Sequence, residues 1–141
     1  MFKWILIICF FYSTASFASF DIKLACKEKE EQKKSLLTNM STSLTEANLA
    51  GQCTGYRSYN NVDVALSCSE FIEQKKSLLS SLSTSLSEAN LAGMCVGAIY
   101  RVAEKCDVNI SYINYSSIAE RAYSLNSIKE QLDCIGGRYG W

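Results

Sequence analysis

The chain has 141 residues, with 14 basic residues balancing 14 acidic ones, seven cysteines and neither histidine nor proline. This length suits one domain with a modest hydrophobic core. The balanced charge provides no basic field for phosphates and argues against a nucleic-acid partner. The absence of histidine removes the commonest general base and a preferred zinc ligand.

The first eighteen residues have the pattern of a secretory signal peptide. Lys3 precedes the apolar run 4–12 (WILIICFFY), and Ser16 and Ala18 are small residues at positions −3 and −1 of a cleavage site. Because the apolar run is too short to cross about 30 Å of hydrocarbon as a helix, we expect no membrane span after cleavage. We therefore predict an exported protein whose mature chain is residues 19–141.

The cysteines of the mature chain predict a disulfide framework. Cys9 leaves with the signal, and an even number remains: Cys26, Cys53, Cys68, Cys95, Cys106 and Cys134. Six cysteines in an exported chain allow fifteen connectivities. Since the sequence has no Cys-x-x-Cys pair and no histidine, a zinc site is disfavoured, and we expect no metal or other cofactor.

Residues 26–55 and 68–97 are two copies of one unit. At an offset of 42 residues, 21 of the 30 aligned positions are identical, which indicates a duplication. Each copy is predicted to form two helices joined by a Ser/Thr-rich turn. In the second copy, Asp63 is the expected N-cap of a helix that runs to about Leu82.

The second helix of that copy is predicted over 86–106, opened by a capping box of Ser85 and Glu88. Its apolar positions recur at spacings of three and four, which is typical of a helix packed on a core. These positions are Ala92, Cys95, Ile99, Val102 and Cys106. Small residues form a ridge beside this face, and we expect the ridge to serve close helix packing. They are Ala89, Gly93 and Gly97.

The first copy differs in its first helix. Residues 27–35 (KEKEEQKKS) contain no apolar side chain, because Lys29 and Glu30 replace Phe71 and Ile72 of the second copy. Such a segment is expected to form a solvated helix. We therefore predict a partly eroded helical-hairpin repeat over 19–62, and a core four-cysteine helical domain over 63–141 that includes the second repeat.

The duplication favours one disulfide scheme. Each copy carries its own pair of cysteines, which predicts Cys26–Cys53 and, by symmetry, Cys68–Cys95. Cys106–Cys134 then completes the set. An exchange of partners among the last four cysteines remains as the alternative at this stage.

The C-terminal third is predicted to be a loop followed by a helix. Residues 107–117 are polar and aromatic without helical periodicity. Ser117 and Glu120 match a capping box that would open a helix ending near Cys134. With no convincing strand pattern anywhere, we predict an all-α, disulfide-stapled fold of about five helices.

Aromatic residues outside the apolar stripes are the candidates for partner binding. Aromatic side chains on loops often anchor protein interfaces. The candidates are Tyr112, Asn114, Tyr115, Tyr139 and Trp141. No serine, carboxylate pair or glycine-rich loop matches a catalytic motif, so we expect no catalytic residues and a binding protein in place of an enzyme.

The segment AGMCVGAIYRV, residues 92–102, resembles the Cys-x-Gly-(Tyr/Ala)-Ile element of the resistance-associated/Tai immunity proteins of type VI secretion. CTGY, residues 53–56, matches the same element in the first copy. The resemblance covers about Cys68–Cys134. These are small exported helical proteins, several of which neutralise cell-wall amidase effectors.

The resemblance implies a periplasmic protein that blocks a secreted cell-wall amidase by binding it, and it implies a homodimer. It assigns no inhibitory residue, because the matching residues Cys95 and Gly97 are expected to be structural. The alternative is a periplasmic scaffold or chaperone-like protein, in which the duplicated hairpin provides additional surface for a client.

Overall fold

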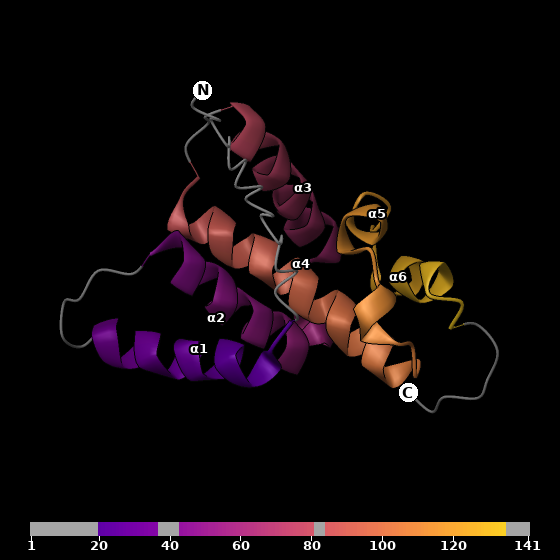
Figure 1. Cartoon of the computed structure of the whole chain (residues 1–141), viewed down its shortest axis with the longest axis horizontal. Helices are drawn as coiled ribbons and strands as arrows, with labels where there is room; N and C mark the ends of the chain where they lie inside the picture. The colour runs from indigo at the N-terminus through magenta and orange to yellow at the C-terminus, as the bar shows by residue number, and fades with distance from the viewer. Residues whose placement is uncertain (1–19, 37–42, 81–83, 135–141) are drawn as a thin grey trace, which may run out of the picture.

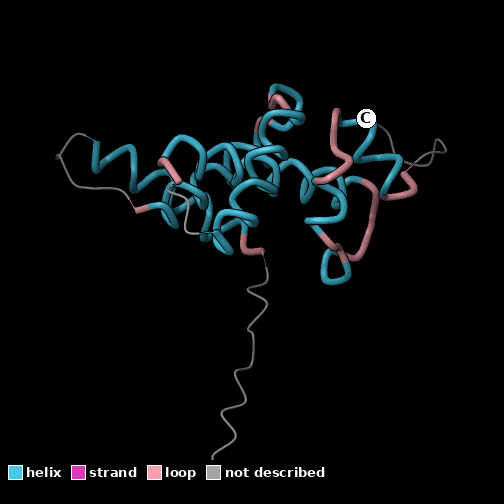
Figure 2. Tube along the Cα trace, turned by 90° about the horizontal axis from the view of Figure 1, so that it is seen from above, coloured by secondary structure: helices cyan, strands magenta, loops and turns pink. Residues whose placement is uncertain are grey.

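The computed structural model describes residues 20–36, 43–80 and 84–134. Within these ranges the regular structure is entirely helical, as Figure 2 shows, which confirms the all-α prediction. There are six α-helices and two short 3₁₀ helices: α1 (Ile22–Leu36), α2 (Leu44–Arg57), η1 (Tyr59–Asn61), α3 (Val64–Ser80), α4 (Leu86–Lys105), η2 (Ile110–Tyr112), α5 (Tyr115–Ala119) and α6 (Leu125–Gln131). The predicted signal peptide, Tyr139 and Trp141 lie outside the described residues.

The pair α2 and α4 forms the centre of the molecule (Figure 1). Each is the second helix of its repeat, and their mutual contact is the most extensive between any two described elements. Helix α1 packs on α2, and α3 packs on α4 in the same way. Helices α5 and α6 pack on α4.

Each helix start in the first repeat has its counterpart in the second. Ser85 with Glu88 forms the predicted capping box of α4, and the equivalent Ser43 with Glu46 forms one at the start of α2. At the starts of α1 and α3, a carboxylate accepts a backbone N–H. Asp21 accepts from Leu24 at 3.2 Å, and Asp63 accepts from Leu66 at 3.0 Å. Equivalent residues therefore set equivalent helix starts.

Three disulfides fasten the helices together. Cys26–Cys53 joins α1 to α2 and Cys68–Cys95 joins α3 to α4, with Cα–Cα distances of 4.8 and 4.9 Å. Cys106–Cys134 ties the end of α4 to the residues after α6, with a Cα–Cα distance of 5.5 Å. These are the pairs favoured by the duplication, and each repeat is closed by its own bond.

The main cluster of buried hydrophobic residues lies in the second repeat and the C-terminal third, while the buried hydrophobic residues of the first repeat are alanines and a cysteine. Ile99, Val102 and Ile128 are fully buried at its centre. Every buried member of the cluster falls between residues 64 and 134: Val64, Cys68, Cys95, Ile99, Val102, Cys106, Ile118, Ala119, Ala122, Ile128 and Cys134. The first hairpin therefore packs on this core from outside, through α2.

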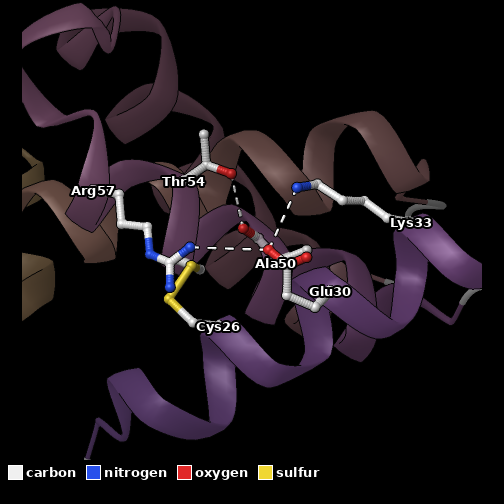
Figure 3. A network of polar contacts seen from close by, with 7 residues as sticks. Cys26, Glu30, Lys33, Ala50, Thr54 and Arg57 are labelled. Atoms are coloured by element: carbon white, nitrogen blue, oxygen red, sulfur yellow. Dashed lines mark hydrogen bonds and ion pairs between the residues drawn. A yellow bond between two sulfur atoms is a disulfide. The ribbon is translucent and has the colours of Figure 1, made fainter.

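At Glu30 the contact between α1 and α2 is polar, whereas its counterpart in the second repeat is apolar. Figure 3 shows Glu30 reaching Lys33 and Arg57, at N–O distances of 3.4 and 3.9 Å, near the Cys26–Cys53 disulfide. The equivalents of Glu30 and Arg57 are Ile72, which packs against the core, and the fully buried Ile99. The expectation of a solvated first helix agrees with this arrangement.

The single helix predicted from Ser117 to Cys134 is wrong. The structure has two helices here, α5 and α6, separated by residues 120–124. The side chain of Asn114 accepts the Ser117 N–H at 3.1 Å and so starts α5 earlier, while Ser124 caps α6 separately. Ser117 and Glu120 therefore do not form a capping box, because Asn114 satisfies the N–H groups at this helix start.

Candidate interaction surface

A groove of about 700 Å³ opens where both repeats meet the C-terminal third. We call it the tyrosine-rimmed groove. Helices α2 and α4 contribute its central wall, α3 a second wall and the start of α1 a third. The segment 111–116 forms the remaining edge. Its lining residues are Phe20, Asp21, Leu24, Leu49, Gln52, Phe71, Lys75, Val96, Ser111, Tyr112, Ile113, Asn114, Tyr115 and Ser116.

Two asparagines shape the edge formed by residues 111–116. The side chain of Asn109 accepts the Ser111 N–H at 3.1 Å and starts η2. The side chain of Asn114 accepts the Ser117 N–H at the same distance and starts α5. Consecutive caps of this kind fix a short connection by satisfying its backbone donors. The edge is therefore a defined structure, although the sequence predicted it as a loop.

Lys75 connects α3 to this edge. Its ammonium group donates a hydrogen bond to Ser116 Oγ and lies 5.5 Å from the centroid of the Phe71 ring. Both Phe71 and Lys75 line the tyrosine-rimmed groove. The α3 wall therefore offers one aromatic face and one cation, and Asp21 on the α1 side is the carboxylate among the lining residues.

The predicted partner-binding residues have three different environments. Tyr112 is 85% exposed at the edge of the groove. Asn114 lines the groove as well, but its side-chain oxygen is engaged in capping α5. Tyr115 is half-buried. The predicted packing residues Gly93 and Gly97 are buried against α2.

Tyr115 carries a buried polar atom. Its hydroxyl has no hydrogen-bond partner among the described residues. Burial raises the pKa of Tyr115 to about 12, with a smaller contribution from the nearby Tyr100. The half-buried ring therefore forms part of the lining of the groove. Its hydroxyl stays neutral over the physiological pH range.

An aromatic cluster that the sequence pattern does not predict lies beside the groove. The Phe20 and Tyr100 ring centroids are 4.1 Å apart, and those of Tyr56 and Tyr100 are 5.6 Å apart. These residues come from the segment before α1, from the end of α2 and from α4. Since they belong to no common helical stripe, no local signal in the sequence predicts their contact.

A polar triad adjoins this cluster and links α2 to α4. The hydroxyl of Tyr56 donates to the Glu104 carboxylate at 2.7 Å, and Arg101 donates to both groups, at 3.1 and 2.6 Å. The Arg101 guanidinium also lies 4.9 Å from the Tyr56 ring centroid. Burial, followed by the hydrogen bond to Glu104, raises the pKa of Tyr56. The first repeat is thus held to α4 at this end by directed contacts.

The tyrosine-rimmed groove has no second copy related by the duplication. The equivalents of its α3 residues Phe71 and Lys75 are Lys29 and Lys33 of α1. The edge 111–116 has no equivalent in the first repeat, because the chain contains the C-terminal third only once. Among the residues that the structure describes, the duplicated framework therefore carries one such groove.

The chemistry of the groove suits contact with another polypeptide. It combines apolar and aromatic surface with isolated polar groups, an exposed tyrosine and one charge of each sign. Among the described residues, no cluster of three or more cysteine, aspartate and glutamate side chains could hold a metal ion. No helix in that part of the chain is long and apolar enough to cross a membrane.

Comparison with protein-family models, with curated proteins and with solved structures found no match for this chain.

Proposed function

We propose that this protein is an exported, non-catalytic immunity-type inhibitor that binds a secreted cell-wall amidase of type VI secretion in the periplasm. The tyrosine-rimmed groove, with Tyr112 at its edge, is the surface that binds the amidase. Inhibition follows from occlusion: the bound inhibitor covers the substrate cleft of the amidase and excludes peptidoglycan.

The observation that carries this proposal is the exposure of Tyr112 on a capped segment. A large aromatic side chain that is 85% exposed in the free protein gains contact area on binding. Since Tyr112 is the last residue of η2 and α5 begins three residues later, Tyr112 loses little backbone entropy when a partner covers it. Exposed aromatic anchors on preformed structure are typical of interface hot spots.

Two further features support a periplasmic location and the binding of one amidase per chain. Three disulfides require an oxidising compartment such as the periplasm for their formation and persistence. The motif residues Cys95 and Gly97 are buried in the α4 packing, so recognition falls to other surfaces. Because the described part of the chain has one such groove, we expect each chain to bind one amidase molecule.

The test is inhibition of a purified amidase by the mature protein. The tagged chain is used to isolate a candidate cell-wall amidase from periplasmic extract. Hydrolysis of purified peptidoglycan by that amidase is then measured at increasing inhibitor concentration. We expect complete inhibition at one chain per amidase, and we expect Tyr112→Ala to weaken binding at least tenfold.

Tyr123→Ala is the matched control, because Tyr123 is also highly exposed, at 74%, and lies away from the groove. This variant should inhibit like the unaltered protein. Equal effects of both substitutions would count against the groove as the binding surface. Weak binding to several unrelated proteins, with no inhibition of any amidase, would favour a scaffold or chaperone-like role instead.

A further inference from the structure

The contact between α2 and α4 is made by equivalent residues of the two repeats. A Cβ atom on Gly51 would overlap the backbone carbonyl of Asn90, and a Cβ on Gly93 would overlap the backbone carbonyl of Asn48. Gly51 is equivalent to Gly93, and Asn48 to Asn90. The backbones of the two helices are therefore in direct contact, and α2 and α4 each contribute the same residues to it.

The next helical turn repeats this reciprocity. A side chain on Gly55 would overlap the backbone of Met94, and one on Gly97 would overlap the backbone of Gln52. Gln52 and Met94 are equivalent positions too. Along both turns the partners advance together, so α2 and α4 run parallel.

The hydrogen bonds across the contact are also reciprocal. The side-chain amide of Asn48 donates to the Ala89 carbonyl at 3.1 Å, and that of Asn90 donates to the Ala47 carbonyl at 3.1 Å. Ala47 and Ala89 are equivalent positions. Each contact from a residue of α2 to a residue of α4 is thus matched by the contact between their two equivalents. Such a contact, in which both sides use the same surface, is isologous, as in a two-fold homodimer.

We propose that the small-residue ridge of α4 is a self-association surface and that the first hairpin occupies, within one chain, the place of a second copy. Because the ridge of α4 packs against the equivalent surface of α2, it should also fit the ridge of α4 in a second copy of the chain. The ridge residues Ala89, Gly93 and Gly97 are identical to their equivalents in α2, and so is the neighbouring Asn90. Met94 and Ala98 replace Gln52 and Tyr56. Because the ridge is already covered in the intact chain, this inference predicts a monomer, in place of the homodimer that the family resemblance implies. This inference does not depend on the proposed amidase inhibition.

The test frees the α4 ridge without altering it. In the oxidised mature chain, Gly51→Leu and Gly55→Leu are combined, so that α2 no longer fits against the backbone of α4. The hairpin stays attached and keeps its Cys26–Cys53 bond. Molar mass is measured by light scattering during size exclusion. We expect the unaltered chain at the mass of one copy, and the double variant at twice that mass.

The control adds Gly93→Leu and Gly97→Leu to the double variant, so that leucines replace the packing glycines of both α2 and α4. This four-glycine variant should return to the mass of one copy, since neither helix then offers a fitting face. Gly51→Ala alone serves as a milder variant if the leucine variants lose their disulfides. Its average molar mass should rise with protein concentration, because a second copy then competes with the weakened α2 contact for the ridge of α4.

Three results would overturn the inference. The first is self-association of the unaltered chain. The second is a dimer of the four-glycine variant, which would show association without the ridge. The third is a constant single-copy mass for the double variant and for Gly51→Ala, while hydrogen exchange shows that the α2 amides have lost protection.

Discussion

Arg57 and Ile99 occupy the same position of the two repeats but have opposite environments. Ile99 is fully buried in the cluster that α4 forms with α3, α5 and α6. The Arg57 side chain is 57% exposed and lies 3.9 Å from the Glu30 carboxylate. The C-terminal third packs on α4 and leaves the same face of α2 open to solvent. Burial at this repeat position is thus set by a neighbour that only one copy has.

This relationship predicts unequal effects of the same truncation. Ile99→Ala removes a fully buried side chain and should lower the free energy of unfolding by about 2–5 kcal/mol. Arg57→Ala loses only an exposed ion pair and should change it by less than about 1 kcal/mol. Urea unfolding of the oxidised mature chain, followed by circular dichroism, measures both. Equal losses would contradict the assignment of the core to the second repeat.

The two repeat disulfides offer a comparison at equal loop length. Cys26–Cys53 and Cys68–Cys95 each span 27 residues, so the chain-entropy model gives the same contribution of about 3–4 kcal/mol to both. Cys53, Cys68 and Cys95 are all fully buried, but only the second pair belongs to the core cluster, and Cys26 is half-buried. Replacing the second pair by alanine should therefore cost about 1 kcal/mol more, because it also leaves a cavity in the core.

The measurement is the difference between the double variants C26A/C53A and C68A/C95A in urea unfolding. Disulfide mapping by mass spectrometry confirms that the remaining two bonds are unchanged in each variant. A larger loss for the first pair would mean that the first hairpin contributes more to the stability of the core than its burial indicates.

The duplication made the framework predictable from sequence, and the C-terminal third was harder. The spacing of the cysteines and the two capping boxes depend on local chemistry that each repeat contains. At Ser117 a capping pattern was present, yet Asn114 supplied the cap instead. The sequence therefore offered two candidate caps three residues apart, and in the structure the Asn114 side chain accepts the Ser117 N–H and starts the helix. Phe20, Leu49 and Tyr112 come from distant parts of the chain and line one groove, an arrangement that the periodicity of the sequence does not predict.

Tyr115 makes stability sensitive to alkaline pH. Its folded-state pKa is raised to about 12 by burial, while the unfolded value is about 10. Below pH 10 the hydroxyl is neutral in both states. Between pH 10 and 12 it ionises only in the unfolded chain, so stability falls as the pH rises through this window.

Tyr115→Phe should therefore flatten the alkaline part of the stability curve. At pH 7 it should also stabilise the protein by about 1 kcal/mol, because it removes a buried hydroxyl without a partner in the described structure. Urea unfolding at pH 7 and pH 11 tests both effects. Tyr112→Phe is the control, since its exposed hydroxyl should make no difference at pH 7. A loss of stability at pH 7 in Tyr115→Phe would show that the hydroxyl has a favourable partner.

Substitutions of Asn114 can show whether this residue positions the groove edge or contacts the partner directly. Its side chain caps α5 and so holds the edge that carries Tyr112. Asn114→Ala should lower the free energy of unfolding by about 1 kcal/mol and weaken amidase binding, because the edge loses its anchor. Asn114→Ser keeps a good N-cap and removes the amide group, so it should retain both stability and binding. If Asn114→Ser unfolds like the unaltered chain yet binds as poorly as Asn114→Ala, the amide contacts the partner directly, and Asn114 belongs to the recognition surface itself.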